Sequence, residues 1–303
     1  MSTEVTADLL RGWPLPSPAA SEKHSRGVAL VVAGSASTPG TARLAAEAAL
    51  RVGCGKVRVA TVSSAAAALA VMVPEARVFG FDEAPSGDLS TEAAATISDL
   101  AAHADATLIG PGFVDPGAAA DLVAAVASSL TGPVMLDALA SAYVGAHPDL
   151  ADLRGPCVLT VNPSELALVL DVGQEEIEAD PAASVSRLAE ASGAVVLLGS
   201  ETKVVATPGG PCYRVTAGGP GLAIAGSGDV QAGLVAGLLA RGAEPAQAAV
   251  WGGWLHATAG DRLAARVGSL GFLTRELAAE VPPLLDGLTR EQSGAGRPTP
   301  TRP

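Results

Sequence analysis

Short, uniformly apolar runs alternate with alanine- and leucine-rich segments along most of this 303-residue chain. Residues 27–33 read GVALVVA and residues 194–198 read AVVLL, with no polar side chain to face solvent. Such runs are typical of strands buried on both faces of a parallel sheet, and the intervening segments have the composition of helices. Aromatic residues make up only 3% of the chain, so Val, Leu, Ala and Ile must supply the core. The pattern predicts an α/β fold with a central, mainly parallel sheet and helices on both faces.

The alternation continues without a linker long enough to divide it, which predicts a single domain over residues 27–288. Residues 1–26 contain three prolines and several charges, and we expect a lead-in segment there. Residues 289–303 lack periodicity, and we expect a disordered tail. A hairpin is predicted to join residues 203–206 to 212–215, and three C-terminal helices are predicted over 229–240, 245–266 and 274–285.

Charge and cysteine content exclude several classes of function. The formal net charge is -12, with 31 acidic and 19 basic residues, which disfavours binding to nucleic acid. The three cysteines form no C-x-x-C pair, so neither a disulfide framework nor a zinc site is expected. The sequence shows no signal-peptide core and no apolar span of about 20 residues. We therefore expect a soluble, cytoplasmic enzyme with a small-molecule partner and no membrane attachment.

The glycine-rich segment 217–229, AGGPGLAIAGSGD, leads directly into a predicted helix. Glycines allow backbone N–H groups to turn inward, and a helix N-terminus adds partial positive charge, so the segment favours phosphate. It matches neither the Walker A motif nor the G-x-G-x-x-G fingerprint. Gly226, Ser227 and Gly228 are the residues expected to hold the anion.

Asp229 ends this segment and has two interpretations of about equal weight from spacing alone. In the first, it is an ordinary first-turn acid that complements the helix dipole. In the second, it is a general base beside bound phosphate, placed to take a proton from an attacking hydroxyl.

Other candidates stand where predicted strands end, since ligands of open parallel sheets bind outside the carboxyl ends of strands. Gly110 and Gly112 follow one strand and form either part of a site or an ordinary turn. Asp137 follows another and is either a helix cap or a ligand for a hydroxyl or, through water, for Mg²⁺. Glu165 is either a helix N-terminal charge or a second polar group of the same site. For His256, a packed core histidine is favoured over a catalyst.

Taken together, these stretches resemble the ADP-dependent NAD(P)H-hydrate dehydratases of the ribokinase-like superfamily. The resemblance covers residues from about 24 to 285, and the order and spacing of its motifs make it more specific than any one of them. The stretches that carry it are VVAGS at 31–35, PGTA at 39–42, RVGCGKV at 51–57, IGPG at 109–112, LDA at 136–138, NPSE at 162–165, AGSGDV at 225–230, LH at 255–256 and AG at 259–260.

The resemblance implies a repair reaction in which ADP or ATP activates the hydroxyl of hydrated NADH or NADPH (NADHX or NADPHX), and loss of phosphate restores the dihydropyridine ring. It implies a ribokinase-like fold, Mg²⁺ as a cofactor, no metal bound by the protein alone, and a homo-oligomer. By position, Asp229 is the base, and Gly226 to Gly228 form the anion hole. The nucleotide is expected along Gly199, Ser200, Glu201, Thr202 and Lys203, and the hydrate beside Thr41, Gly110, Gly112, Asp137, Asn162 and Glu165.

The chain departs from the family pattern at four of these places. Asn162-Pro163-Ser164-Glu165 replaces the usual His-Pro-Gly-Glu, and Leu198-Gly199 replaces Lys-Gly, so that a phosphate-side cation is missing unless Lys203 substitutes for it. Leu139 follows Asp137-Ala138 where Asp or Gly is usual, and Val230-Gln231 replaces Val-Leu after the aspartate.

Two alternative functions remain open from the sequence. A ribokinase-like kinase of a small alcohol would use the same anion hole and aspartate base, and would differ at the hydrate pocket around Asn162. A nucleotide-binding protein without catalytic activity would be consistent with Leu198 in place of the lysine.

Overall fold

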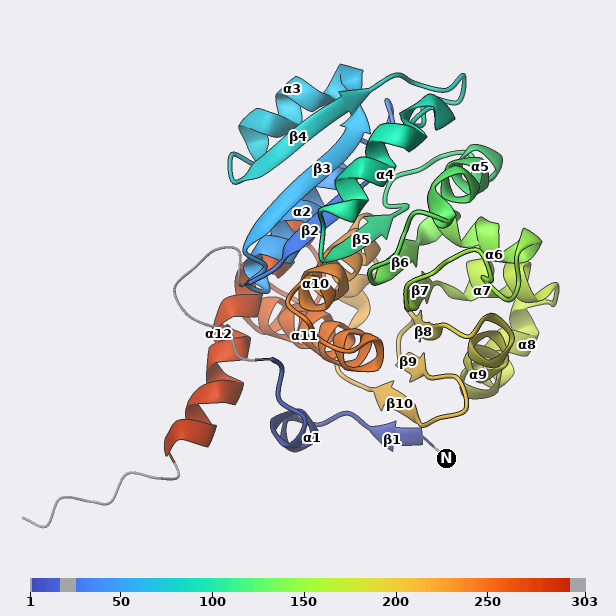
Figure 1. Cartoon of the computed structure of the whole chain (residues 1–303). Coiled ribbons are helices and arrows are strands. Elements are labelled where there is room, and N and C mark those ends of the chain that lie inside the picture. Colours follow the sequence, from blue (N-terminus) through green and yellow to red (C-terminus); the bar gives the residue numbers. More distant parts are fainter. Residues whose placement is uncertain (1, 17–25, 295–303) are drawn as a thin grey trace, which may run out of the picture.

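The computed structural model describes residues 2–16 and 26–294, and side chains as far as residue 288. One sheet of ten strands crosses the molecule in the order β1-β10-β9-β8-β7-β6-β5-β2-β3-β4 (Figure 1). The strands are β1 (Ser2–Glu4), β2 (Val28–Val32), β3 (Lys56–Val62), β4 (Ala76–Phe81), β5 (Ala106–Ile109), β6 (Val134–Asp137), β7 (Cys157–Val161), β8 (Val195–Leu198), β9 (Lys203–Ala206) and β10 (Cys212–Val215).

In the sheet order from β8 through β7, β6, β5, β2 and β3 to β4, all neighbouring strands are parallel. Strand β9 is antiparallel to both of its neighbours, β8 and β10. The mainly parallel sheet is therefore confirmed, as is the hairpin that joins β9 to β10. Because the parallel strands share one direction, their carboxyl ends form one edge of the sheet, where ligands of such folds bind.

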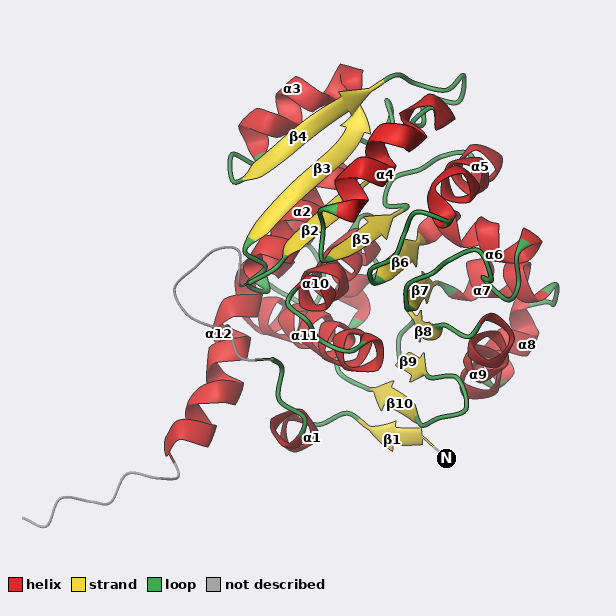
Figure 2. Cartoon of the chain, in the orientation of Figure 1, coloured by secondary structure: helices red, strands yellow, loops and turns green. Residues whose placement is uncertain are grey.

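Helices cover both faces of the sheet (Figure 2). Helices α2, α10, α11 and α12 gather on one face, and α4, α5 and α9 lie on the other (Figure 1). The α-helices are α1 (Ala7–Gly12), α2 (Gly40–Arg51), α3 (Ser63–Met72), α4 (Ala94–Ala102), α5 (Pro116–Ala127), α6 (Ala142–Ala146), α7 (Pro163–Leu170), α8 (Gln174–Ala179), α9 (Pro181–Ser192), α10 (Ser227–Ala240), α11 (Pro245–Arg266) and α12 (Thr274–Gly294). Short 3₁₀ turns are η1 (Thr91–Ala93), η2 (Ala138–Ser141) and η3 (Pro220–Leu222).

Helix α10 is the most deeply enclosed helix of the site, and glycines set its distance from α2. A Cβ built at Gly233 would lie 2.2 Å from the Ala45 carbonyl oxygen, and one at Gly237 would lie 2.8 Å from Ala49 Cα. Only glycine permits such a close approach of two backbones. Since Gly233 and Gly237 are one turn apart, the packing fixes the axis of α10 and thereby the direction in which its N-terminus points.

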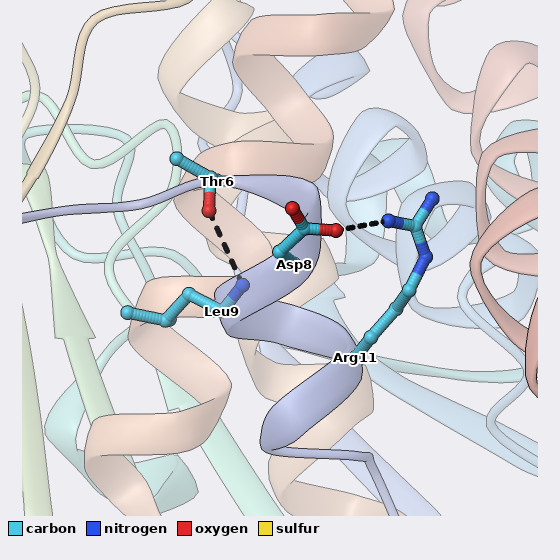
Figure 3. Close-up of polar contacts among 4 residues, drawn as sticks. All are labelled: Thr6, Asp8, Leu9 and Arg11. Carbon is cyan, nitrogen blue, oxygen red and sulfur yellow. Dashed lines mark hydrogen bonds and ion pairs between the residues drawn. The ribbon is translucent and has the colours of Figure 1, made fainter.

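The expected lead-in segment is partly structured. Strand β1 pairs in parallel with β10 and so extends the sheet at that edge. Helix α1 begins after Thr6, whose Oγ1 accepts a hydrogen bond from the Leu9 N–H at 3.2 Å, and an Asp8–Arg11 ion pair of 2.6 Å follows (Figure 3). Gln247 and Trp251 of α11 both donate to the Trp13 carbonyl oxygen. The sequence did not predict β1, because three residues are too few to show a period.

The C-terminal helix extends further than the sequence predicted. Helix α12 passes the predicted end at Leu285 and continues to Gly294, so that part of the segment expected as a disordered tail is helical. Residues 289–292 read TREQ and include good helix formers, which allows the helix to continue past its packed part. The rest of the predicted tail, residues 295–303, lies outside the described residues.

Candidate functional site

A cavity of about 820 Å³ opens at the carboxyl edge of the parallel strands. The ends of β6, β7 and β8 form its floor, the segment 217–224 covers one side, and α10 and α11 close the back. Most of the residues that the sequence singled out line it, namely Asp137, Asn162, Glu165, Gly199, Ser200, Glu201, Lys203, Gly226, Ser227, Gly228 and Asp229.

The glycine turn that opens α10 is fixed from two sides. Gly226 has φ +86°, and a Cβ there would lie 2.6 Å from Leu44 Cδ1 of α2. Thr274 Oγ1 at the start of α12 donates to the Ala225 carbonyl oxygen at 2.8 Å. The first N–H groups of a helix have no acceptor within the helix, and the residues that carry them here line the cavity. The Ser227 N–H donates to the Ile224 carbonyl oxygen at 3.2 Å. The arrangement is suited to an anion.

Asp229 lies in the first turn of α10, on the cavity wall, with 9% of its surface exposed. Burial raises the pKa of its carboxyl to about 7. A first-turn aspartate that only complemented the helix dipole would gain nothing from burial, and ionisation near neutral pH is the property of a general base. Burial and the raised pKa are the properties that the second interpretation of Asp229 requires, and the role of general base stays a prediction.

Asp137 ends β6 and faces the same cavity. It precedes η2 but makes no side-chain capping bond, so the structure does not support the cap interpretation. Instead, the Thr160 hydroxyl donates to Asp137 Oδ1. Burial, and then the negative charge of Asp229, raise the pKa of Asp137 well above its ordinary value. Asp137 and Asp229 therefore disfavour each other's ionisation when both approach the charged form.

Asn162 and Glu165 form a capping box at the start of α7. Asn162 Oδ1 accepts from the Glu165 N–H at 2.9 Å, and Glu165 Oε2 accepts from the Asn162 N–H at 2.9 Å. Ser164 Oγ also donates to Asn162 Oδ1, at 2.6 Å. Burial raises the pKa of Glu165. The residue that departs from the family histidine therefore serves as a helix cap at the cavity rim.

Three predicted substrate residues lie beside the cavity and are not among the described residues that line it. Thr41 Oγ1 donates to the Thr38 carbonyl oxygen at 2.8 Å. A Cβ at Gly112 would lie 2.0 Å from that Oγ1, and a Cβ at Gly110 would lie 1.9 Å from the Asp137 carbonyl oxygen. Both glycines have positive φ. Gly110 thus allows close packing against the end of β6, which carries Asp137, and Gly112 allows close packing against the start of α2.

The β8–β9 connection contributes four of its five predicted residues to the cavity, and Thr202 is the exception. Its carbonyl oxygen accepts from Ser200 Oγ at 2.5 Å, which holds the turn together. Lys203 is 5% exposed, and burial lowers its pKa to about 8. No ion pair to Lys203 occurs among the residues that the structure describes.

Three polar residues of the cavity were not predicted as site residues: Thr160 on β7 was not considered, Gln231 was noted only as a departure from the family, and His256 was interpreted as a packed core histidine. Gln231 of α10 is 4% exposed, and its Oε1 has no hydrogen-bond partner. His256 of α11 is 2% exposed, its Nε2 lies 2.9 Å from Ser227 Oγ, and its Nδ1 has no partner. Burial, and then the Lys203 charge, lower the pKa of His256 well below its ordinary value. The signal for Gln231 was a polar residue in an otherwise apolar helix.

In the described part of the chain, no group of three or more His, Cys, Asp or Glu side chains could hold a metal ion by itself. The same part contains no helix that is both long and apolar enough to cross a membrane.

The parallel sheet, the cavity at its carboxyl edge and the aspartate at the start of α10 define a ribokinase-like nucleotide-binding protein. Solved structures agree on the fold. Phosphofructokinase-2 from Escherichia coli superimposes with a TM-score of 0.52 at 14% identity, over 80% of this chain and 86% of its own.

The chain belongs to the NAD(P)H-hydrate dehydratase family, whose model matches residues 29–283. It is 41% identical to an ADP-dependent (S)-NAD(P)H-hydrate dehydratase from Xanthomonas campestris, over 94% of this chain and 97% of that protein. A bifunctional NAD(P)H-hydrate repair enzyme from Moorella thermoacetica is 35% identical over 90% of this chain, which spans 52% of that longer protein. The ADP/ATP-dependent NAD(P)H-hydrate dehydratase from Bacillus subtilis, co-crystallized with ATP/Mg²⁺, superimposes with a TM-score of 0.81 at 26% identity, over 95% and 99% of the two chains.

Proposed function

We propose that the protein catalyses the nucleotide-dependent dehydration of the S form of hydrated NADH or NADPH, which restores NADH or NADPH. The observation that carries the proposal is Asp229, a buried carboxyl with a pKa of about 7 beside a helix N-terminus suited to phosphate. The family membership and the cavity volume of about 820 Å³, within the range of small-molecule sites, support it.

In the proposed reaction, the Asp229 carboxylate takes the proton of the hydrate's hydroxyl, whose oxygen attacks the terminal phosphoryl group of the nucleotide. The bond from that phosphorus to the bridging oxygen breaks, and the nucleotide leaves with one phosphate fewer. The neighbouring ring carbon then loses a proton while the carbon–oxygen bond to the new phosphate breaks, which forms the ring double bond. Asp229 supplies the first step, and the N–H groups of residues 226–228 stabilise the charge on phosphate.

The nucleotide is proposed to lie along residues 199–203, with its terminal phosphate at the glycine turn. Gly199, Ser200, Glu201 and Lys203 line the cavity on the side that leads from β8 to this turn. ADP is the favoured nucleotide, because the Xanthomonas and Neisseria meningitidis relatives are named ADP-dependent dehydratases.

Mg²⁺ fits this site only in combination with the nucleotide. No carboxylate cage of three groups exists among the described residues, and Mg²⁺ commonly binds through one or two carboxylates plus substrate phosphates. Asp137 and Asp229 are the carboxylates that face the phosphate position and would contribute to its binding. Bound there, the ion would supply charge neutralisation on the phosphates.

The hydrate is proposed to lie between Asp229 and the rim formed by Asn162 and Glu165, with Asp137 on the floor. Thr41, Gly110 and Gly112 would then shape this end of the site from behind. We also propose that the protein acts as a homo-oligomer in the cytoplasm. Size-exclusion chromatography with light scattering tests the first of these statements.

The test is the recovery of near-ultraviolet dihydropyridine absorbance from purified NADHX, with ADP, with ATP and with no nucleotide. We expect recovery only with nucleotide, and with ADP above ATP. Absence of recovery with either, in a protein that binds nucleotide, would contradict the proposal. Kinase assays with small alcohols then separate the two other hypotheses, since transfer of phosphate to an alcohol indicates a kinase and binding without turnover a silent homologue.

A further inference from the structure

A group of polar side chains at the back of the cavity has hydrogen-bonding capacity that the described residues leave unused. Lys203 comes from β9, Gln231 and Ser227 from α10, and His256 from α11, and all four line the cavity. Each is at most 6% exposed. Gln231 Oε1 and His256 Nδ1 have no hydrogen-bond partner, and no ion pair to Lys203 occurs in the described part of the chain. Buried polar groups in proteins are almost always hydrogen-bonded, so unused capacity at one place indicates a ligand. The two unpartnered atoms are acceptors, and the groups of the cluster that could bind an anion are the Lys203 ammonium, the Gln231 amide N–H groups and the Ser227 hydroxyl.

Ser227 and Gln231 stand one turn apart on α10 and therefore share a face of that helix. His256 contacts this face through the 2.9 Å bond from its Nε2 to Ser227 Oγ, and Lys203 is close enough for its charge to act on His256. Gly253, one turn before His256, leaves room for the lysine, since a Cβ there would lie 3.8 Å from Lys203 Cδ. The four side chains thus form one cluster.

The cluster is rich in hydrogen-bond donors. Lys203 carries up to three N–H donors and has no ion-pair partner in the described part of the chain. The Gln231 amide carries two more, and its Nε2 lies 3.7 Å from a Cβ built at Gly199. A neutral His256 loses less by burying an unpaired Nδ1 lone pair than an unpaired N–H, which favours the tautomer with the proton on Nε2. In that tautomer His256 donates to Ser227 Oγ, and the serine hydroxyl is free to donate to a ligand.

We propose that Lys203, Gln231 and Ser227, with Ser227 oriented by His256, form a second oxyanion subsite that binds phosphate oxygens beside the glycine turn. The inference rests on the proposed function in that the phosphate comes from a nucleotide, either still attached to it or as the inorganic phosphate released. Gln231 and Lys203 act by direct contact with phosphate, and His256 is a positioning residue. The lysine would thereby supply from β9 the positive charge that Leu198 cannot supply from β8.

Lys203 does not simply take the place of the family lysine that Leu198 replaces, because the side chains of residues 198 and 203 lie on opposite faces of the sheet. Leu198 pairs with Val204 across β8 and β9, so these two side chains lie on the same face of the sheet. Because side chains alternate along a strand, their neighbours Leu197 and Lys203 lie on the other face. Leu197 faces α11, where its Cδ1 lies 3.5 Å from a Cβ built at Gly253, and Lys203 reaches the same glycine. Lys203 therefore approaches the phosphate from the α10–α11 side, next to Gln231.

Calorimetric titrations with ADP, AMP, adenosine and inorganic phosphate test the subsite without any turnover. We expect Lys203→Met to weaken ADP binding about tenfold or more and adenosine binding less than about twofold, because a charge-assisted hydrogen bond is lost. Gln231→Leu introduces the residue typical of the family at this position and should weaken ADP binding about threefold to tenfold. Lys56→Met, at the amino end of β3, removes the same charge away from the cavity and should change neither affinity.

Loss of inorganic phosphate binding alone would assign the subsite to the released product, and loss of ADP binding would assign it to the nucleotide.

Proton uptake on ADP binding gives a second readout, which a purely structural effect of the substitution would not produce. Phosphate beside Lys203 favours its charged form, so ADP binding at pH 8 should take up about half a proton more in wild type than in Lys203→Met. The other titratable groups that face the cavity are Asp137, Glu165, Glu201, Asp229 and His256, and they are common to both proteins.

Equal affinity for ADP and for inorganic phosphate in wild type and Lys203→Met, with equal proton uptake, would overturn the inference, as would an equal loss for ADP and adenosine. Failure of the wild type to convert NADHX to NADH, with the lysine effect on ADP binding intact, would instead contradict the proposed function and leave the subsite in place.

Discussion

The cavity lining contains an acidic and a basic set of side chains, termed the acidic wall and the basic wall, and burial shifts their pKa values in opposite directions. On one wall, Asp137, Glu165 and Asp229 have raised pKa values, and on the other, Lys203 and His256 have lowered ones. Burial is the first cause in every case, because a low-dielectric interior disfavours the charged form of acids and bases alike. Folding thus favours the neutral forms of the side chains on both walls, and a bound phosphate would favour the charged forms on the basic wall.

The walls also differ in how they are held. The acidic wall is anchored by hydrogen bonds within the protein, including the capping box of Asn162 and Glu165 and the bond from Thr160 to Asp137. The basic wall has unpartnered atoms on Gln231 and His256. A wall whose groups are hydrogen-bonded keeps its geometry without ligand, whereas the Lys203 ammonium on the basic wall gains a partner when an anion binds.

The largest effect that should separate the walls is on turnover. Asp229→Asn removes the base but no backbone donor, so we expect the turnover number for NADHX to fall about 10²- to 10⁴-fold, while ADP affinity changes less than about threefold. The measurement combines the absorbance assay with calorimetric titration of ADP. Asp121→Asn, an exposed aspartate on α5, is the matched control. Unchanged turnover in Asp229→Asn would rule out this residue as the base.

Asp229→Asn should also reveal how much the burial of the Asp229 carboxyl reduces the stability of the folded protein. The folded pKa of Asp229, about 7, is raised from 3.8, so the stability that its protonated form contributes is fully present below pH 4 and is lost as pH rises through 7. Asp229→Asn lacks this loss, and its free energy of unfolding relative to wild type should rise between pH 4 and pH 8 by at most about 4 kcal/mol. Urea unfolding at several pH values measures it. A pH-independent difference would show that the Asp229 carboxyl is not buried as described.

Changes at the glycine turn test the phosphate side with less effect. Gly226→Ala combines a positive φ with a methyl group 2.6 Å from Leu44 Cδ1, so the turn must shift. We expect ADP affinity to fall about tenfold or more, because the backbone N–H groups of the turn would no longer point at the phosphate. At Gly228 a Cβ meets nothing within 4 Å and φ is not positive, so Gly228→Ala should cost less. Equal losses in the two variants would show that backbone conformation at residue 226 is unimportant for binding.

The smallest effect concerns the coupling between the two aspartates. If Asp137 is neutral at pH 7, Asp137→Asn removes no charge from the neighbourhood of Asp229. The acid limb of the kcat/KM profile should therefore stay within about 0.5 pH unit of its wild-type position near pH 7. A downward shift of more than about one unit in Asp137→Asn would mean that Asp137 carries charge in the working enzyme.

The sequence predicted the parallel sheet, the β9–β10 hairpin and the glycine turn with Asp229, because each depends on local pattern. Uniform apolar runs identify buried strands, and a glycine cluster before a helix identifies an anion site whatever surrounds it. Resemblance added the residues of the β8–β9 connection. The three-residue strand β1 and the end of α12 lay beyond what periodicity can show.

Tertiary structure alone decided which chemistry each of these residues has. Asp229 and Lys203 have ordinary pKa values in an unfolded chain, and only the packing of α10, α11 and the ends of β6 to β9 removes them from water. Gln231 and His256 join the site because i,i+4 spacing on α10 and one contact from α11 bring them to Ser227, although 29 residues separate Ser227 from His256 in the chain. Sequence specifies which groups are present, but burial and neighbouring charge, which set their protonation, come from long-range contacts.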